Sequence, residues 1–392
     1  MNVPLLDLQP QMSRFRDQVL EAVTSVIDST RYILGSEVSR FEKEVAAYCG
    51  TGFGIGVSSG TDALLASLMA LEIGAGDLVL TTPYTFFATM GSILRVGARP
   101  VFADIDPDTM NIDPAQVERI LADDQAGRKK IRAIMPVHLF GQCADMQPLL
   151  ELAARYGIPI IEDAAQAIGA QYPLEENGAV TWKKAGAMGT AGCFSFFPSK
   201  NLGGIGDGGM VVTSDSGLDR ILRSCRDHGA DPKYYHRRIG GNFRLDPIQA
   251  VVLSIKLPHL EEWHRARRRN ATLYREYFSQ AGLTDNPVVL PREAYGGLEG
   301  AAEVNYHIYN QFVIRVPDRD RLRSFLQENS IGCEIYYPLC LHQQACLAPL
   351  GYGDQTFPVA EEAARQALAL PIYPELQQEQ IAYVVEKISE FF

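Results

Sequence analysis

Between residues 54 and 163 the sequence alternates short apolar runs with longer segments whose apolar residues recur at helical spacing. Short strands separated by helices are typical of an α/β domain with a mainly parallel sheet. Ligands of such domains bind at the carboxyl ends of the strands, so we expect the functional residues there. The predicted strands are 54–58, 77–82, 100–104, 133–137 and 159–163, and the predicted helices are 61–73, 85–97, 114–122 and 145–156.

The rest of the sequence extends this pattern into a second, smaller unit. A chain of 392 residues exceeds the usual size of one hydrophobic core. We therefore predict a large α/β domain over residues 1–250, including an N-terminal segment, and a smaller α/β domain over residues 251–392. The elements predicted outside the alternating region are helices at 13–30, 37–48, 247–278 and 318–329, strands at 209–213 (antiparallel), 307–316 and 332–337, a loop at 284–304, and two helices near the C-terminus.

Charge and composition argue against several classes of protein. The net charge of −11 argues against general binding of nucleic acids, whose phosphates require a basic surface. No run approaches the roughly 18 apolar residues of a membrane helix, and the N-terminus lacks the basic start of a secretory signal. The seven cysteines form no Cys-x-x-Cys pair, so we expect free thiols in the cytoplasm, and no metal site.

Lys200 is the candidate nucleophile. It follows the aromatic, largely apolar segment 194–198 and precedes a glycine-rich turn that begins at Gly203. Loss of water around an amine lowers its pKa and makes it nucleophilic toward a carbonyl. Asp163 ends an apolar strand upstream, and this order is expected where the lysine holds pyridoxal 5′-phosphate and the carboxylate faces the ring nitrogen. The plainer alternatives are a solvated surface lysine and a polar strand end.

The segment 58–63 is a candidate phosphate site. It joins a predicted strand to a predicted helix, so its backbone N–H groups and hydroxyls would bind a phosphate dianion. A plain N-cap by Ser59 or Thr61 is the alternative. Phe86 would either stack on the ring of the cofactor or belong to the core, and Gln166 would reach the phenolic oxygen of the cofactor.

Two other motifs point away from nucleotide binding. Gly204-x-Gly206-x-x-Gly209 matches the dinucleotide fingerprint letter by letter, but it precedes a predicted strand instead of opening a helix. The sequence has no Gly-Lys-Ser/Thr, which excludes a P-loop. Residues 234–244 are basic, aromatic and glycine-containing, and would either close over an anionic ligand or form a surface loop.

Taken together, these residues resemble the pyridoxal phosphate-dependent sugar aminotransferases of the DegT/DnrJ/EryC1/StrS family, which have the fold-type-I aminotransferase fold. The resemblance spans almost the whole chain, and many motifs in one order are more specific than any single motif. The motifs that carry the resemblance lie at 31–35, 58–64, 136–142, 162–166, 194–203, 241–246, 337–342 and 370–376.

The resemblance implies a role for each matching residue. Lys200 would form the Schiff base with pyridoxal 5′-phosphate, Asp163 would pair with the pyridinium nitrogen, and Gln166 would lie near the phenolic oxygen. Asn242 would come from the neighbouring subunit, which implies a homodimer with active sites at the interface. The other residues expected to bind the cofactor are Ser59, Gly60, Thr61, Phe86 and Ser195. Candidates for substrate contact, each with a structural role as the alternative, are Tyr32, His138, Arg237, Arg238, Tyr336, Tyr337 and His342, with Lys233 and Arg244 as further cations.

The resemblance also implies a reaction. The amino group of L-glutamate would pass to a keto group of a nucleotide-linked sugar, giving an amino sugar. Some relatives replace the lysine with histidine and are sugar dehydratases, so Lys200 favours transamination. A dehydratase of the same fold and a non-catalytic regulatory paralogue remain the alternatives.

Overall fold

The computed structural model describes residues 1–124, 131–176, 178–284 and 286–392. A four-stranded sheet (β1-β9-β8-β5) and a three-stranded sheet (β3-β2-β4) are joined by parallel bridges from Ile134 to Ile160 and from Val137 to Asp163. All strands of the combined sheet are parallel except β9, as predicted. The strands are β1 (Phe53–Val57), β2 (Leu78–Thr81), β3 (Arg99–Phe102), β4 (Ile131–Ile134), β5 (Ile161–Asp163), β8 (Ala191–Ser195) and β9 (Gly209–Thr213).

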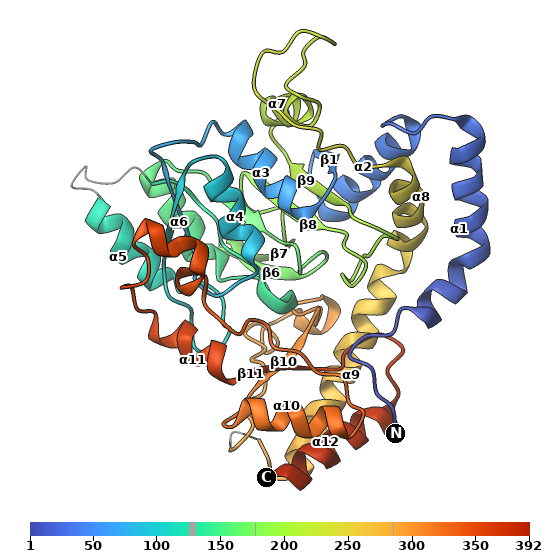
Figure 1. The fold of residues 1–392 in the computed structure, drawn as a ribbon, viewed down its shortest axis with the longest axis vertical. Helices are drawn as coiled ribbons and strands as arrows, with labels where there is room; N and C mark the ends of the chain where they lie inside the picture. Colours follow the sequence, from blue (N-terminus) through green and yellow to red (C-terminus); the bar gives the residue numbers. More distant parts are fainter. Residues whose placement is uncertain (125–130, 177, 285) are drawn as a thin grey trace.

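Helices cover this sheet and bury its apolar side chains in two clusters. The predicted helices of the alternating region are confirmed, with boundaries that differ by a few residues. They are α3 (Gly60–Ala70), α4 (Phe87–Arg95), α5 (Pro114–Asp124) and α6 (Met146–Tyr156). The N-terminal helices α1 (Gln9–Ser29) and α2 (Ser36–Cys49) pack against α8 (Pro247–Lys256), and α7 (Ser216–Arg226) packs against α3 (Figure 1).

The long helix predicted at 247–278 is interrupted. After α8 the chain forms a 3₁₀ turn at Leu257–His259 and continues as α9 (Leu260–Gln280). Pro258 lies in this turn and has no N–H to donate to the preceding turn of an α-helix, which accounts for the interruption. The apolar residues of the helix still face the core on both sides of the turn.

The second half of the chain builds a separate small sheet. β10 (Phe312–Arg315) and β11 (Ala367–Leu370) are antiparallel, and α9, α10 (Arg319–Glu328) and α12 (Gln378–Phe391) pack around a core of their own. Helix α11 (Pro358–Gln366) leads directly into β11. Val3, at the start of the chain, belongs to this second core. The division of the chain after residue 250 stays a proposal.

Several expectations differ from the structure. The antiparallel hairpin of β6 (Gln171–Glu176) and β7 (Ala179–Lys184) was not predicted, nor was β11. The strand expected at 332–337 is wrong, because only Glu334 forms a bridge there, to Ala369. The strand expected at 307–316 begins only at Phe312. In the described parts of the chain, every helix is too short or too polar to cross a membrane.

Candidate functional site

A cavity of about 700 Å³ lies where the carboxyl ends of β1, β5 and β8 meet the segment Glu334–Tyr337. One wall therefore belongs to the large sheet and the opposite wall to the second half of the chain. The residues singled out from the sequence that line it are Ser59, Gly60, Thr61, Phe86, Asp163, Gln166, Ser195, Lys200, Tyr336 and Tyr337.

The turn that carries Lys200 is held from several directions. The Lys200 N–H donates to Phe197 O at 2.8 Å, and the Asn201 side chain donates to Ile308 O at 3.1 Å. The buried Lys256 amine, from the last residue of α8, donates to Gly203 O. A Cβ on Gly203 would lie 2.2 Å from Pro198 O, so the close approach in this turn requires glycine. The Lys200 backbone is therefore fixed between both halves of the chain.

The environment of the Lys200 amine favours its neutral form. Burial lowers the pKa of Lys200 to about 8, although the nearby Asp163 carboxylate acts in the opposite direction. A neutral amine is the form that acts as a base or attacks a carbonyl. The desolvation expected from the aromatic segment before Lys200 agrees with this shift.

Asp163 lies buried at the end of β5. Its Oδ2 accepts a hydrogen bond from Thr89 Oγ1 at 2.7 Å, and its Oδ1 accepts a longer one from the Ala165 N–H at 3.3 Å. Burial raises the pKa of Asp163, and the hydrogen bond from Thr89 opposes that rise. Thr89 was not predicted from the sequence, although Thr81, Thr82 and Thr85 just before it form a run of hydroxyl side chains.

The start of α3 combines a helix cap with an open N-terminus. Ser59 Oγ accepts from the Asp62 N–H at 3.0 Å, so the plain N-cap expected as an alternative is present. The first N–H groups of a helix, here at Gly60 and Thr61, have no acceptor inside it. A Cβ on Gly60 would lie 2.7 Å from Ser195 Cβ, so only glycine allows β8 to approach this terminus so closely. The arrangement suits an anion.

Gln166 has a fixed amide orientation. Its Oε1 accepts from the Phe140 N–H at 2.7 Å, and its Nε2 donates to Tyr337 Oη at 3.0 Å. Tyr337 also lies beside Phe86, with ring centroids 6.1 Å apart. Phe86 is 58% exposed and lines the cavity, so it is not a core residue.

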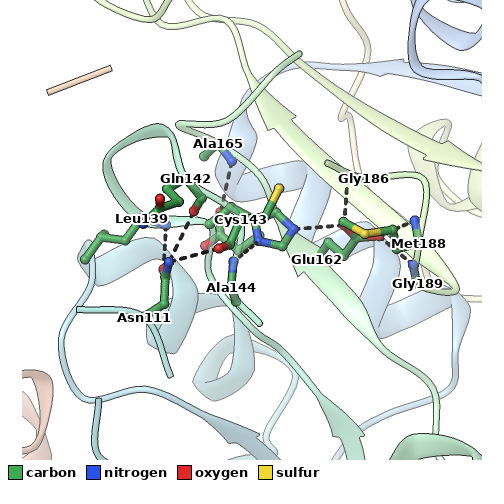
Figure 2. Close-up of polar contacts among 12 residues, drawn as sticks. Asn111, Leu139, Gln142, Cys143, Ala144, Glu162, Ala165, Gly186, Met188 and Gly189 are labelled. Carbon is green, nitrogen blue, oxygen red and sulfur yellow. Dashed lines mark hydrogen bonds and ion pairs between the residues drawn. The ribbon is translucent and has the colours of Figure 1, made fainter. Parts of the chain in front are cut away.

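His138 does not reach the cavity. Its Nδ1 accepts from the Ala144 N–H at 3.0 Å, so its Nε2 carries the proton and donates to Glu162 Oε2 at 2.8 Å. The same carboxylate accepts from the backbone N–H groups of the loop 186–189. Figure 2 shows Glu162 between this loop and Ala144. In the structure His138 therefore has a structural role instead of contacting the cavity, and it links β5 to the neighbouring loops.

Seven other candidates lie outside the cavity lining, among them Lys233, which is exposed, and Arg244, whose Nη1 donates to Asp227 Oδ1. His342 is buried, with Nε2 3.3 Å from Glu361 Oε1. Tyr32 is half-exposed and donates to Ile27 O at 3.1 Å. Arg237, Arg238 and Asn242 are exposed on the segment that follows α7 and projects from the body of the molecule at the top of Figure 1.

The charge of the cavity is unbalanced. Of the described residues that line it, Lys200 alone has a basic side chain, whereas Asp163, Asp207 and Glu334 are acidic. The sequence analysis named neither Asp207 nor Glu334. No positional pattern in the sequence distinguishes these two from surface carboxylates.

Known proteins resemble the chain over its whole length. The sequence model of the DegT/DnrJ/EryC1/StrS aminotransferase family matches residues 14–389. The chain is 48% identical to a pleiotropic regulatory protein of Geobacillus stearothermophilus, over 100% of this chain and 99% of that protein. It is 41% identical to the UDP-N-acetyl-3-dehydro-α-D-glucosamine 3-aminotransferase of Acidithiobacillus ferrooxidans, over 98% and 97%. The crystal structure of S. venezuelae DesV with a ketimine intermediate superposes with a TM-score of 0.88, at 39% identity over 100% and 98%.

Proposed function

Because the chain belongs to the DegT/DnrJ/EryC1/StrS aminotransferase family, whose aminotransferases depend on pyridoxal 5′-phosphate, we propose that it transfers the amino group of L-glutamate to a keto group of a nucleotide-linked sugar. The observation that carries the proposal is one cavity in which a lysine of lowered pKa and a buried carboxylate lie beside an open helix N-terminus. These are the groups that a pyridoxal phosphate enzyme requires.

The cavity residues fit the cofactor. Lys200 Nζ would bind it covalently, Asp163 would accept a hydrogen bond from the ring nitrogen, and Gln166 would donate to the phenolic oxygen. The phosphate would lie at Ser59, Gly60, Thr61 and Ser195, where the first N–H groups of α3 have no acceptor inside the helix, and Phe86 would cover the ring. When bound, pyridoxal phosphate supplies an electron sink that stabilises negative charge on the reacting carbon.

Lys200 would move the protons of the reaction. Its Nζ would take a proton from the α-carbon of the amino donor and later return one to the former carbonyl carbon of the sugar. Only the neutral amine can accept this proton. Because burial lowers the pKa of Lys200 to about 8, the neutral amine is present at moderately alkaline pH. Thr89 would hold Asp163 in place throughout, through its hydrogen bond to Oδ2.

The substrates require cations that the cavity lacks. Glutamate and a nucleotide diphosphate are both anions, and Lys200 is the single basic side chain among the described lining residues. The segment that projects after α7 carries Lys233, Arg237 and Arg238, together with Tyr234 and Ile239, which are 79% and 86% exposed. We infer a homodimer in which this segment, with Asn242, completes the cavity of the partner subunit.

We place the enzyme in the cytoplasm. All seven cysteines are free thiols in the structure, and six of them are buried. A reducing compartment keeps thiols in this state.

A labelling experiment tests the proposed reaction. The purified protein is incubated with L-glutamate labelled on its amino nitrogen and with a panel of nucleotide-linked keto-sugars. We expect the label in one sugar product, detected by mass. Lys200→Ala should remove the absorbance of the lysine-bound cofactor and lower turnover by about 10²–10⁴-fold. Full turnover by this variant, or loss of water from the sugar in place of amination, would contradict the proposal.

A regulatory role is the second candidate. One relative at 48% identity is named a pleiotropic regulatory protein. The presence of Lys200, Asp163 and the anion site in one cavity argues for catalysis instead. A protein that stays colourless after addition of pyridoxal phosphate would favour regulation.

A further inference from the structure

The wall of the cavity formed by the second half of the chain presents an unused acceptor at Glu334. Its Oε1 accepts from the Ile335 N–H at 2.9 Å and from Arg323 Nη2 at 3.2 Å. Among the described residues, none donates a hydrogen bond to Oε2. The side chain is 44% exposed and lines the cavity, so this oxygen is accessible to a ligand.

Gln311 supplies a second unused acceptor on the same wall. It immediately precedes β10 and lines the cavity. Its Oε1 is buried and accepts no hydrogen bond from the described part of the chain. A buried amide oxygen without a donor costs free energy, so a hydrogen-bond donor from a ligand would stabilise it.

The acidic side chains near Glu334 disfavour a carboxylate on the sugar ring. Asp163, Asp207 and Glu334 line the cavity, and the one amine, Lys200, must be neutral when it acts as a base. A carboxylate that entered next to Glu334 would lose water and meet a like charge at short range. A hydroxyl or an amide N–H would instead donate to the free oxygens.

We propose that Glu334 and Gln311 bind the sugar through its hydroxyl or amide N–H donors and thereby select an uncharged keto-hexose over the corresponding uronic acid. This inference rests on the proposed function. A site built to accept hydrogen bonds from a hydroxyl rejects an analogue that cannot donate them, because its own polar groups are then left unpaired.

The test compares a matched pair of substrates with the holoenzyme. One is a nucleotide-linked keto-hexose with a hydroxymethyl group on its ring, and the other carries a carboxylate at the same position. We expect the wild-type protein to prefer the hexose by about 10²-fold or more in kcat/KM. Glu334→Gln removes the negative charge of this side chain and keeps its shape. It should lower the ratio of the two kcat/KM values about tenfold or more, partly because the variant protein binds the uronate better. Gln311→Leu should lower kcat/KM for the hexose.

Glu328→Gln is the matched control. Glu328 is exposed at the end of α10, the helix that also carries Arg323, and it does not line the cavity. This variant should keep the wild-type preference. The half-reaction with glutamate alone, followed by the absorbance of the cofactor, should not be slowed in Glu334→Gln, because the substitution removes a negative charge and glutamate is an anion.

Different outcomes refute different claims. An unchanged preference in both Glu334→Gln and Gln311→Leu would overturn the inference, as would a wild-type protein that prefers the uronate. Equal slowing of the glutamate half-reaction and the sugar half-reaction by Glu334→Gln would also overturn it, because the residue would then not act on the sugar. A wild-type protein that aminates neither sugar would refute the proposed function itself, and the inference with it.

Discussion

Burial acts on Asp163 and Lys200 in opposite directions, and both effects favour the neutral form. It raises the pKa of the Asp163 carboxyl and lowers the pKa of the Lys200 amine to about 8. The two groups partly offset these shifts, because the carboxylate stabilises the ammonium. The Thr89 hydroxyl and the Ala165 N–H both donate to Asp163 and so oppose the rise of its pKa.

The lowered pKa of Lys200 predicts an unusual pH dependence of its reactivity. In the protein freed of cofactor, the rate of acylation of Lys200, followed by peptide mass, should rise with pH and level off above about 8. An ordinary lysine, with a pKa near 10.4, continues to gain reactivity well beyond that pH. Asp163→Asn should move the midpoint lower, because it removes the charge that stabilises the ammonium. A midpoint near 10 in both proteins would contradict the burial argument.

At this scale the sequence predicted the residues that carry chemistry better than the residues that position them. Lys200 and Asp163 stand out because an apolar run precedes each of them. Thr89 and Glu334 do not, because their importance comes from distant parts of the chain: Thr89 donates to Asp163, and Glu334 lines a cavity whose other wall belongs to the large sheet. The structural role of His138, which was one of its two expected roles, likewise depends on a partner outside its own segment, Glu162 on β5.

Among the elements, α8 links the N-terminal helices to the lysine turn. It packs against α1 and α2 on one side, and Lys256 at its end reaches Gly203 on the other. Lys256 is buried, with its amine 5.9 Å from the centroid of the Trp263 ring. Burial lowers the pKa of Lys256 to about 8. Burial of an amine costs free energy unless it is hydrogen-bonded, so the bond to Gly203 O offsets part of the cost of burying Lys256.

Replacing Lys256 tests this link. Lys256→Met keeps the apolar stem but leaves Gly203 O without its donor, which should cost about 1–3 kcal/mol of folding stability. Because Gly203 belongs to the turn of Lys200, pyridoxal phosphate should also dissociate faster, which is measured from its absorbance during dilution. Lys43→Met, an exposed position on α2, makes the same chemical change as a control and should alter neither quantity. Equal behaviour of the two variants would exclude the link.

Helices and strands could be predicted from the sequence where their apolar residues recur at a regular spacing along one face. The alternating region 54–163 follows that rule, and its strands and helices were found within a few residues. The hairpin β6–β7 was missed because β7 is largely exposed and has a mixed pattern of charged and apolar residues. The segment 332–337 contains strand-forming residues, yet Tyr84 Oη contacts Tyr336 O and the Tyr337 N–H, which holds this segment over the cavity.

For the whole molecule, the main structural question is how an acidic protein would hold the two anionic substrates that we propose. The net charge is −11, and the cavity of one chain contains a single basic side chain among its described lining residues. The basic segment after α7 projects away from the body of its own chain (Figure 1). Its large apolar side chains Tyr234 and Ile239 are exposed. Two copies related by a two-fold axis would each insert this segment into the other, since such an interface is reciprocal.

This arrangement predicts recovery of activity from two inactive proteins. Lys200→Ala removes the base, and Asn242→Ala combined with Arg238→Ala impairs the projecting segment. In a mixed dimer, one of the two cavities would contain Lys200 from its own chain and an intact projecting segment from the other chain. About half of the re-associated dimers are mixed, so the mixture should regain up to about a quarter of wild-type turnover. Lys200→Ala mixed with Asp163→Asn is the control and should regain none, because both residues serve the cavity of their own chain. Absence of recovery in the first mixture, with mixed dimers demonstrated by mass, would show that each chain completes its own cavity.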